Sequence, residues 1–154
     1  MELDRRHVGF EIKVVSNMLR RIVGAIGHAN YFDSLTGSNT WIIGYLARHQ
    51  DRDIFQKDLE QEFSIRRSTA SKTLQLMEEK DLIRREPVFY DARLKKITLT
   101  EKALEIHKIV QEDLEEANRI ATKDLSDEEI AQFFAVMEKI RNNLLNDTQL
   151  QGGK

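Results

Sequence analysis

Hydroxyl, amide and cationic side chains gather along one face of a segment in the middle of the chain. At helical spacing this face comprises Ser68, Thr69, Ser71, Lys72 and Gln75. These side chains suit the major groove of DNA, where Lys reaches guanine acceptors, Gln pairs with adenine, and hydroxyls bond phosphates or base edges. Arg66 and Arg67, at or just before the start of the segment, are placed for phosphates. The alternative is an ordinary solvated helix face, although Ser and Thr favour helix caps over helix interiors.

A second charged cluster lies in the stretch YDARLKKITLT, residues 90–100, which ends in the alternating pattern of a half-buried strand. Asp91 and Arg93 stand at its start, where we expect the tip of a hairpin. A tip that only turns the chain would usually contain Asn-Gly or Asp-Gly, and this one contains no glycine. Its composition therefore indicates a contact with another molecule. Arg93 could enter a minor groove while Asp91 fixes its direction. The alternative is an exposed turn salt bridge, worth at most about 1 kcal/mol. The predicted DNA contacts of the hairpin are Arg85, Asp91, Arg93 and Lys95.

Charge is unevenly distributed along the chain, whose net charge is −2. Residues 66–96 carry 9 Lys and Arg against 5 Asp and Glu, which gives +4. Residues 1–65 carry 8 against 9, and residues 97–154 carry 7 against 12. A local basic segment, more than the total charge, steers a protein to phosphate. The alternative is a chance excess of cations on a solvated face.

Composition excludes several classes of protein. The 154 residues, 40% of them hydrophobic, suffice for one compact domain or two intertwined subdomains. The chain has no Cys, which excludes disulfides and thiolate metal sites. Its four His lack the close spacing of a ligand set, so neither a metal nor another cofactor is expected. No phosphate loop or nucleophile elbow is present, so we do not expect an enzyme. Without a signal peptide or a long apolar run, the protein is expected to be cytoplasmic, with no membrane partner.

Two short helices and two strands are predicted in the middle of the chain. Residues 55–63 have apolar positions at helical spacing, and a three-residue turn leads to the helix that carries the hydroxyl-rich face. Asp81 is expected to end this helix, because Asp tolerates the left-handed conformation. Strands are expected at residues 82–86 and 95–99, with Pro87 ending the first and residues 88–93 crossing between them. A hairpin that follows a helix-turn-helix makes a winged helix.

Amphipathic helices are predicted on both sides of this module, each with an apolar stripe. The stripes are Val8, Ile12, Val15, Leu19, Ile22 and Ile26; then Ala103, His107, Val110, Leu114, Ala117 and Ala121; then Ile130, Phe133, Met137, Ile140 and Leu144. A further helix, with Trp41, Ile42, Tyr45 and Leu46, is expected to begin near Thr36 or Ser38. Thr100 is a plausible N-cap, and Ser126 with Glu129 forms a capping box.

The small central module cannot cover all three stripes, so we expect a two-fold homodimer. The sequence therefore predicts a mainly α fold with a small β-wing, an α+β winged helix-turn-helix. Its long N- and C-terminal helices, residues 1–34 and 101–147, would form the dimerisation region. Residues 35–100 would form the DNA-binding domain, and residues 148–154 a flexible tail.

Residues 66–103, RRSTASKTLQLMEEKDLIRREPVFYDARLKKITLTEKA, resemble the recognition helix and wing of MarR-family transcriptional regulators. The matching residues are Arg67, Ser68, Thr69, Leu82, Ile83, Asp91, Arg93, Ile97, Leu99 and Thr100. The resemblance implies a homodimer with recognition helices in successive major grooves of a pseudo-palindromic operator in double-stranded DNA, and we expect a repressor. The sequence departs from the family pattern at Ser64, Asp81 and Ala103, which replace usual glycines, and at Arg66, where a capping Ser is common. Phe55 likewise stands where a cap residue often precedes the first short helix.

The resemblance also implies release from DNA by a small aromatic or phenolic ligand held between the dimer helices and the winged helix. The candidate pocket residues are Arg20, His28, Tyr31, Phe32, Trp41 and Tyr45. The alternative is that the aromatic residues are simply core.

A different class of function competes with DNA binding: a winged-helix module that contacts protein and lacks sequence-specific DNA binding. Such a surface would carry apolar or aromatic anchors. The helix face carries Arg, Lys and hydroxyls instead, but Val88, Phe89 and Tyr90 in the hairpin keep the alternative open.

Overall fold

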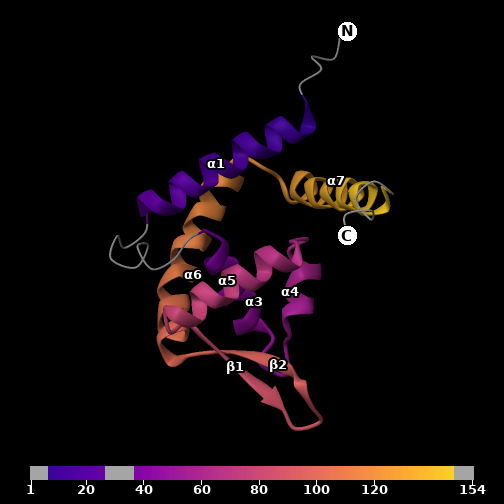
Figure 1. Cartoon of the computed structure of the whole chain (residues 1–154). Helices are drawn as coiled ribbons and strands as arrows, with labels where there is room; N and C mark the ends of the chain where they lie inside the picture. Colours follow the sequence, from indigo (N-terminus) through magenta and orange to yellow (C-terminus); the bar gives the residue numbers. More distant parts are fainter. Residues whose placement is uncertain (1–6, 27–36, 148–154) are drawn as a thin grey trace. The chain divides into compact units, whose positions relative to one another are not determined.

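The computed structural model describes residues 7–26 and 37–147 (Figure 1). The chain divides into two compact units, residues 1–117 and 118–154. In order, the elements are α1 (Val8–Ile26), α3 (Gly37–Arg48), α4 (Gln56–Glu62), α5 (Arg67–Glu79), β1 (Ile83–Val88), β2 (Asp91–Leu99), α6 (Glu101–Thr122) and α7 (Asp127–Asn146). The described residues thus confirm the mainly α fold with a two-stranded antiparallel wing.

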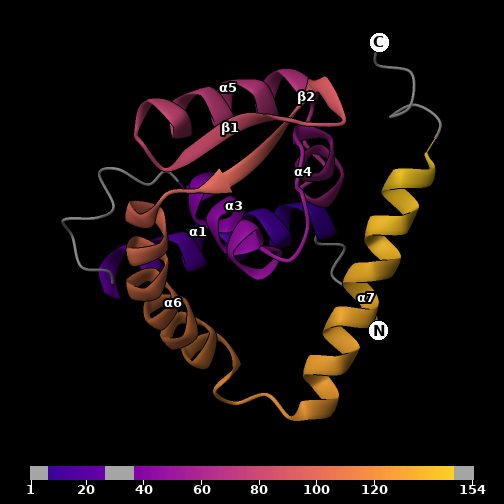
Figure 2. The same cartoon turned by 90° about the horizontal axis from the view of Figure 1, so that it is seen from below.

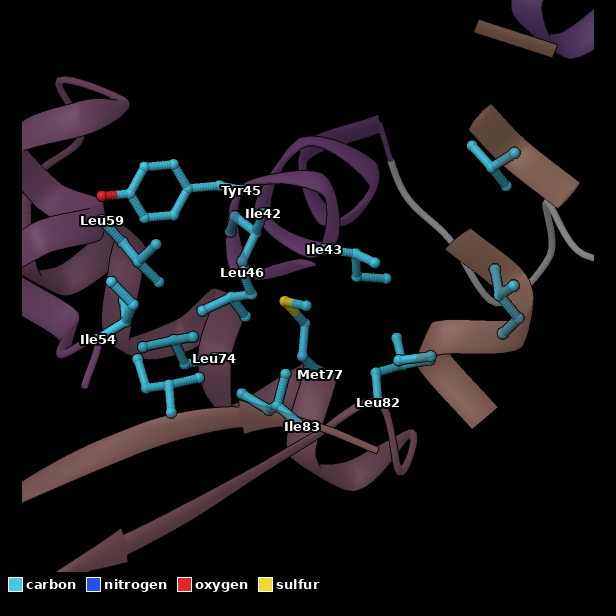
Figure 3. Packing of buried hydrophobic residues seen from close by; sticks show 14 residues of the cluster. Ile42, Ile43, Tyr45, Leu46, Ile54, Leu59, Leu74, Met77, Leu82 and Ile83 are labelled. Atoms are coloured by element: carbon cyan, nitrogen blue, oxygen red, sulfur yellow. The ribbon is translucent and has the colours of Figure 1, made fainter. Parts of the chain in front are cut away.

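The core of the first unit lies among α3, α4, α5, the wing and the start of α6 (Figure 3). Apolar side chains at helical spacing converge there: Ile43 and Leu46 from α3, Leu59 from α4, and Leu74 and Met77 from α5 are all buried. Removing a side chain of this size from such a core typically costs about 2–5 kcal/mol. This packing fixes which face of α5 points inward, and it leaves the hydroxyl-rich face outside.

Two residues with positive φ end the short helices. Ser64, just after α4, has φ 48°, and Asp81, just after α5, has φ 56°. The MarR family, which this sequence resembles, usually has glycine at these two positions. The left-handed backbone conformation explains that preference. The prediction that Asp81 ends the recognition helix is confirmed.

Thr100 joins the end of β2 to the start of α6. Its hydroxyl accepts a hydrogen bond from the N–H of Ala103 (3.2 Å) and donates one to the carbonyl of Asp81 (2.7 Å). The predicted N-cap is therefore present, and the same side chain fixes the exit of α5. The capping box at the start of α7 is also confirmed, with Ser126 N–H to Glu129 at 2.8 Å and Glu129 N–H to Ser126 at 3.2 Å.

The inner stripe of α6 differs from the predicted one. Its buried residues are Ala103, Ile106, Val110, Asp113 and Ala117, at spacings of 3, 4, 3 and 4. Of the predicted stripe, Ala103, Val110 and Ala117 are buried, His107 and Leu114 are half-buried, and Ala121 is exposed. The buried residues and the predicted stripe share Ala103, Val110 and Ala117, and both sets fit helical periodicity. Only packing against the other elements determines that Ile106 is buried as well.

The wing also differs from the prediction. β1 continues through Pro87 to Val88, and β2 already begins at Asp91, so only Phe89 and Tyr90 turn the chain. Pro87 is tolerated because proline occurs in edge strands and beside bulges. Pro87 pairs with Lys95 and Val88 with Asp91, so residues 92–94 form a bulge in β2.

Two links outside the hairpin tie the wing to the helices. The N–H of Ile97 donates to the carbonyl of Ile54 (2.8 Å), so the segment before α4 pairs with the free side of β2. On the other side, β1 lies beside α5 in both views (Figures 1 and 2). The hairpin and α5 are therefore held by the same group of packed elements, and both have an outer face that is exposed to solvent.

Candidate nucleic-acid interface

The outer face of α5 is exposed along its whole predicted length. Arg66, Arg67, Ser68, Thr69, Ser71, Lys72 and Gln75 are all classed as exposed. The inner face is anchored by Ala70, Leu74 and Met77, of which Leu74 and Met77 have no exposed surface. The structure thus brings the seven predicted residues together on one helix face that an α-helix can present to a major groove.

Helix α5 begins without a side-chain cap. Arg66 occupies the N-cap position with extended backbone and makes no capping hydrogen bond, as the departure from the family pattern predicted. The first N–H groups of a helix lack intrahelical partners and favour anions. An uncapped start flanked by two arginines is therefore suited to a phosphate. The N-cap position of α4 is Phe55, whose backbone N–H donates a hydrogen bond to the Asp58 carboxylate (2.8 Å).

Asp91 holds Arg93 in a fork of hydrogen bonds. The guanidinium donates through Nε to Oδ1 (3.2 Å) and through Nη2 to Oδ2 (3.3 Å), and the backbone N–H of Arg93 donates to Oδ1 (3.0 Å). These bonds hold the pKa of the Asp91 carboxyl below its ordinary value. The Arg93 side chain remains 90% exposed, so its outer edge is available to a partner. Contrary to the prediction, the pair does not lie at the tip: Arg93 projects from the bulge beside it.

Arg85 links the wing to the recognition helix. Its Nε donates to Glu78 of α5 at 3.0 Å, and its Nη2 bonds the same carboxylate oxygen. The hydrogen bond from Arg85 lowers the pKa of Glu78. The predicted DNA contact of Arg85 remains a prediction, but the geometry already gives this side chain a positioning role. Lys95, also predicted to contact DNA, is exposed on β2.

Asp53, in the loop before α4, is a positioning residue that sequence reasoning missed. Its carboxylate lies 3.6 Å from Lys96 Nζ and accepts a long hydrogen bond from the Tyr90 hydroxyl (3.4 Å). Asp53 is 37 residues away from Tyr90 in the chain, so no local pattern signals this contact. Glu78 was missed for the same reason, since its partner lies on another element.

The predicted ligand pocket is only partly within the described residues. His28, Tyr31 and Phe32 lie outside them. Tyr45 is buried, and its hydroxyl accepts from Arg52 (2.9 Å), whereas Trp41 is 58% exposed. A groove of about 260 Å³ lies between the end of α3 and β2, lined by residues such as His49, Asp53 and Lys96, with none of the predicted pocket residues. The ligand pocket stays a prediction.

Comparisons with known proteins agree with this geometry. A model of the MarR family matches residues 33–94. An uncharacterized HTH-type transcriptional regulator of Staphylococcus aureus (strain MSSA476) is 31% identical over 109 residues, covering 70% of this chain and 73% of the relative. The crystal structure of the transcription regulator MarR from Oenococcus oeni PSU-1 is similar at 32% identity and a TM-score of 0.74, over 88% of this chain and 98% of that one. The S. aureus MepR–DNA complex is similar in fold at 24% identity and a TM-score of 0.79, over 90% and 99% of the two chains.

The fold and the exposed helix face define a winged helix-turn-helix protein of the DNA-binding class. The chain belongs to the MarR family and is a DNA-binding transcriptional regulator, not an enzyme. Among the helices of residues 7–26 and 37–147, none is long and apolar enough to cross a membrane.

Proposed function

We propose that the protein acts in the cytoplasm as a homodimer that recognises a pseudo-palindromic operator in double-stranded DNA. The observation that carries the proposal is the exposed face of α5, where Lys72 and Gln75 supply base-reading groups and Arg66 and Arg67 supply charge for phosphates. A two-fold dimer would place two such helices about one helical turn apart, near 34 Å, in successive major grooves. A dimer of this span on a promoter excludes other proteins from it, so we propose repression.

Exposed apolar side chains on the long helices support the homodimer. No residue of α1 or α7 is buried in the single chain. Val8, Val15 and Leu19 of α1 are exposed, as are Phe133 and Leu144 of α7, all at stripe positions of the predicted dimerisation region. Such patches mark association surfaces in soluble proteins. The division into residues 1–34 and 101–147 for dimerisation and 35–100 for DNA remains part of this proposal.

Selection of bound duplexes from a random DNA pool tests the proposal. With purified protein at near-physiological salt, we expect enrichment of a two-fold symmetric site with half-sites about one helical turn apart. The same selection with Gln75→Ala should relax base preference at one symmetric pair of positions. A pool without any enriched motif would overturn the proposal.

We further propose that a small aromatic or phenolic ligand releases the protein from DNA. This proposal rests on the exposed Trp41 and on Arg20, which is exposed on α1 and could pair with a carboxylate. A panel of aromatic acids and phenols, added to the protein on its selected duplex, should contain compounds that lower its DNA affinity. Trp41→Ala should weaken their effect while leaving DNA affinity without ligand unchanged. Equal responses of both proteins would count against this pocket.

One observation favours a second candidate function, a winged-helix module that contacts protein. Phe89 and Tyr90 expose two aromatic rings at the wing tip, and aromatic side chains are frequent anchors of protein interfaces. Sequence-specific DNA binding in the selection would argue against this as the main role.

A further inference from the structure

The wing tip consists of two aromatic residues that the turn itself does not require. Val88 pairs with Asp91, so Phe89 and Tyr90 alone reverse the chain. Two-residue hairpin turns favour Gly, Asn and Asp. Neither Phe89 nor Tyr90 is among the described residues with positive φ, and Phe89 is 100% exposed. Phe89 lies outside the buried core, so packing of the core does not require an aromatic residue here.

The tip is held in a defined direction. The Phe89 ring meets the Tyr90 ring edge to face, with centroids 5.2 Å apart and planes at 87°. The Tyr90 hydroxyl donates to Asp53, which also pairs with Lys96 of β2. A side chain whose neighbours are fixed loses less conformational entropy when it binds a partner. Tyr90 and Asp53 therefore act as positioning residues for Phe89.

The charges around the tip indicate the chemistry of its partner. Arg93 and Lys95, which follow the tip on β2, are exposed. The hairpin extends from the helices of the first unit, with the tip at its far end (Figure 1). An apolar ring flanked by cations fits a surface with anions at its rim and apolar faces inside. The DNA minor groove has this composition, with phosphates along its edges and sugars and base edges within.

We propose that Phe89 is an apolar minor-groove contact at each end of the operator and a determinant of specificity there. The inference rests on the proposed function and deepens it. Apolar side chains inserted from the minor groove partly unstack base steps, and pyrimidine–purine steps open most easily. Phe89 therefore favours flexible steps in the flanks of the site, while Arg93 contacts the phosphates or the groove floor beside it.

Comparison of Phe89→Ala with the wild type tests this assignment. On the duplex selected by the wild type, we expect Phe89→Ala to bind about tenfold more weakly, because each protomer loses its apolar contact in the minor groove. Because no phosphate contact is lost, the slope of log affinity against log salt should stay unchanged. Selection with this variant should lose the preference for flexible steps in the flanks and keep the central half-sites. Leu94→Ala removes another exposed apolar side chain of the same hairpin and should behave as the wild type.

Two results would overturn the inference while leaving the proposed function intact. One is wild-type affinity and flanking preference in Phe89→Ala, which would show that Phe89 does not contact the operator. The other is an equal loss in Leu94→Ala, which would remove the special role of the tip. A wild type that selects no DNA site at all would instead overturn both proposals. Because Phe89 is fully exposed, its replacement should leave the melting temperature unchanged, and circular dichroism checks this directly.

Discussion

At the scale of single residues, the Asp91–Arg93 pair shows how a carboxylate can serve a cationic contact. The fork of hydrogen bonds orients the guanidinium, yet 90% of the Arg93 side chain stays exposed. An exposed pair of this kind adds little to stability, because solvent screens the two charges. Its value to the protein therefore lies in the direction that it gives Arg93, not in the free energy of folding.

Replacing Arg93 with Ala should weaken binding to the operator about tenfold or more and leave the melting temperature within about 1 °C, because Arg93 buries little surface. If Arg93 meets a phosphate, the slope of log affinity against log salt should become shallower by about 0.9 for each protomer, or about 1.8 for the proposed homodimer. Fluorescence anisotropy at several salt concentrations measures both effects.

Lys108→Ala is the matched control, since it removes an exposed cation of α6. It should change the affinity far less than Arg93→Ala. Equal affinities of Arg93→Ala and wild type would contradict the role assigned to the wing arginine.

At the scale of elements, the ends of the two short helices carry backbone strain that glycine would remove. Ser64→Gly should raise the free energy of unfolding by about 0.5–1 kcal/mol, because a left-handed non-glycine residue costs about 1–2 kcal/mol and glycine adds entropy to the unfolded chain. Urea denaturation measures the change. Glu112→Gly, on the exposed face of α6, should have the opposite effect by about 0.5–1 kcal/mol. A destabilised Ser64→Gly variant would contradict the assignment of backbone strain to Ser64 and would show that the serine side chain itself stabilises the fold.

The contact between α3 and α6 makes stability depend on pH. His107 of α6 lies over Gly44 of α3, near Arg48, and burial together with the Arg48 charge lowers the pKa of His107 below its ordinary value of 6.5. In the window from pH 6.5 down to the lowered pKa, the unfolded chain binds a proton that the folded chain does not, so stability falls as pH falls. His107→Gln should lose this part of the pH dependence, measured by melting temperature between about pH 5 and 8. Parallel curves for the two proteins would contradict the assignment.

Local patterns in the sequence were enough to predict the elements but not their contacts. The inner residues of α5 and the turn at Asp81 follow from spacing and backbone preference, which act within a few residues. The wing tip was misplaced because Pro87 reads as a strand stop, whereas its place in a two-stranded sheet beside a bulge tolerates it. The link from Glu78 to Arg85 could not be predicted, since it depends on how separate elements pack.

At the scale of the whole molecule, the proposed homodimer rests on the apolar side chains left exposed on α1 and α7. Phe133→Glu places a charge on the stripe of α7 and should convert the proposed homodimer to a monomer, because burying an unpaired carboxylate is costly. Analytical ultracentrifugation should then report the mass of one chain instead of two.

Lys139→Glu, an exposed change on the same helix, should leave the proposed homodimer intact. The monomeric variant should also lose most of its affinity for a symmetric operator, because one recognition helix alone engages half of the site. A Phe133→Glu protein that remains dimeric would place the interface elsewhere.

If the exposed face of α5 reads DNA sequence, the protein must bind its operator far more tightly than other duplexes, so the ratio of specific to non-specific affinity is the decisive measurement. Anisotropy titrations at near-physiological salt would compare the selected duplex with a scrambled duplex of the same composition. Sequence reading predicts an affinity at least about 10³-fold higher for the selected duplex. The ratio should fall sharply when Lys72 and Gln75 are both replaced by Ala. Equal affinity for the two duplexes, with binding that only weakens as salt rises, would contradict the claim and leave a protein that meets DNA through charge alone.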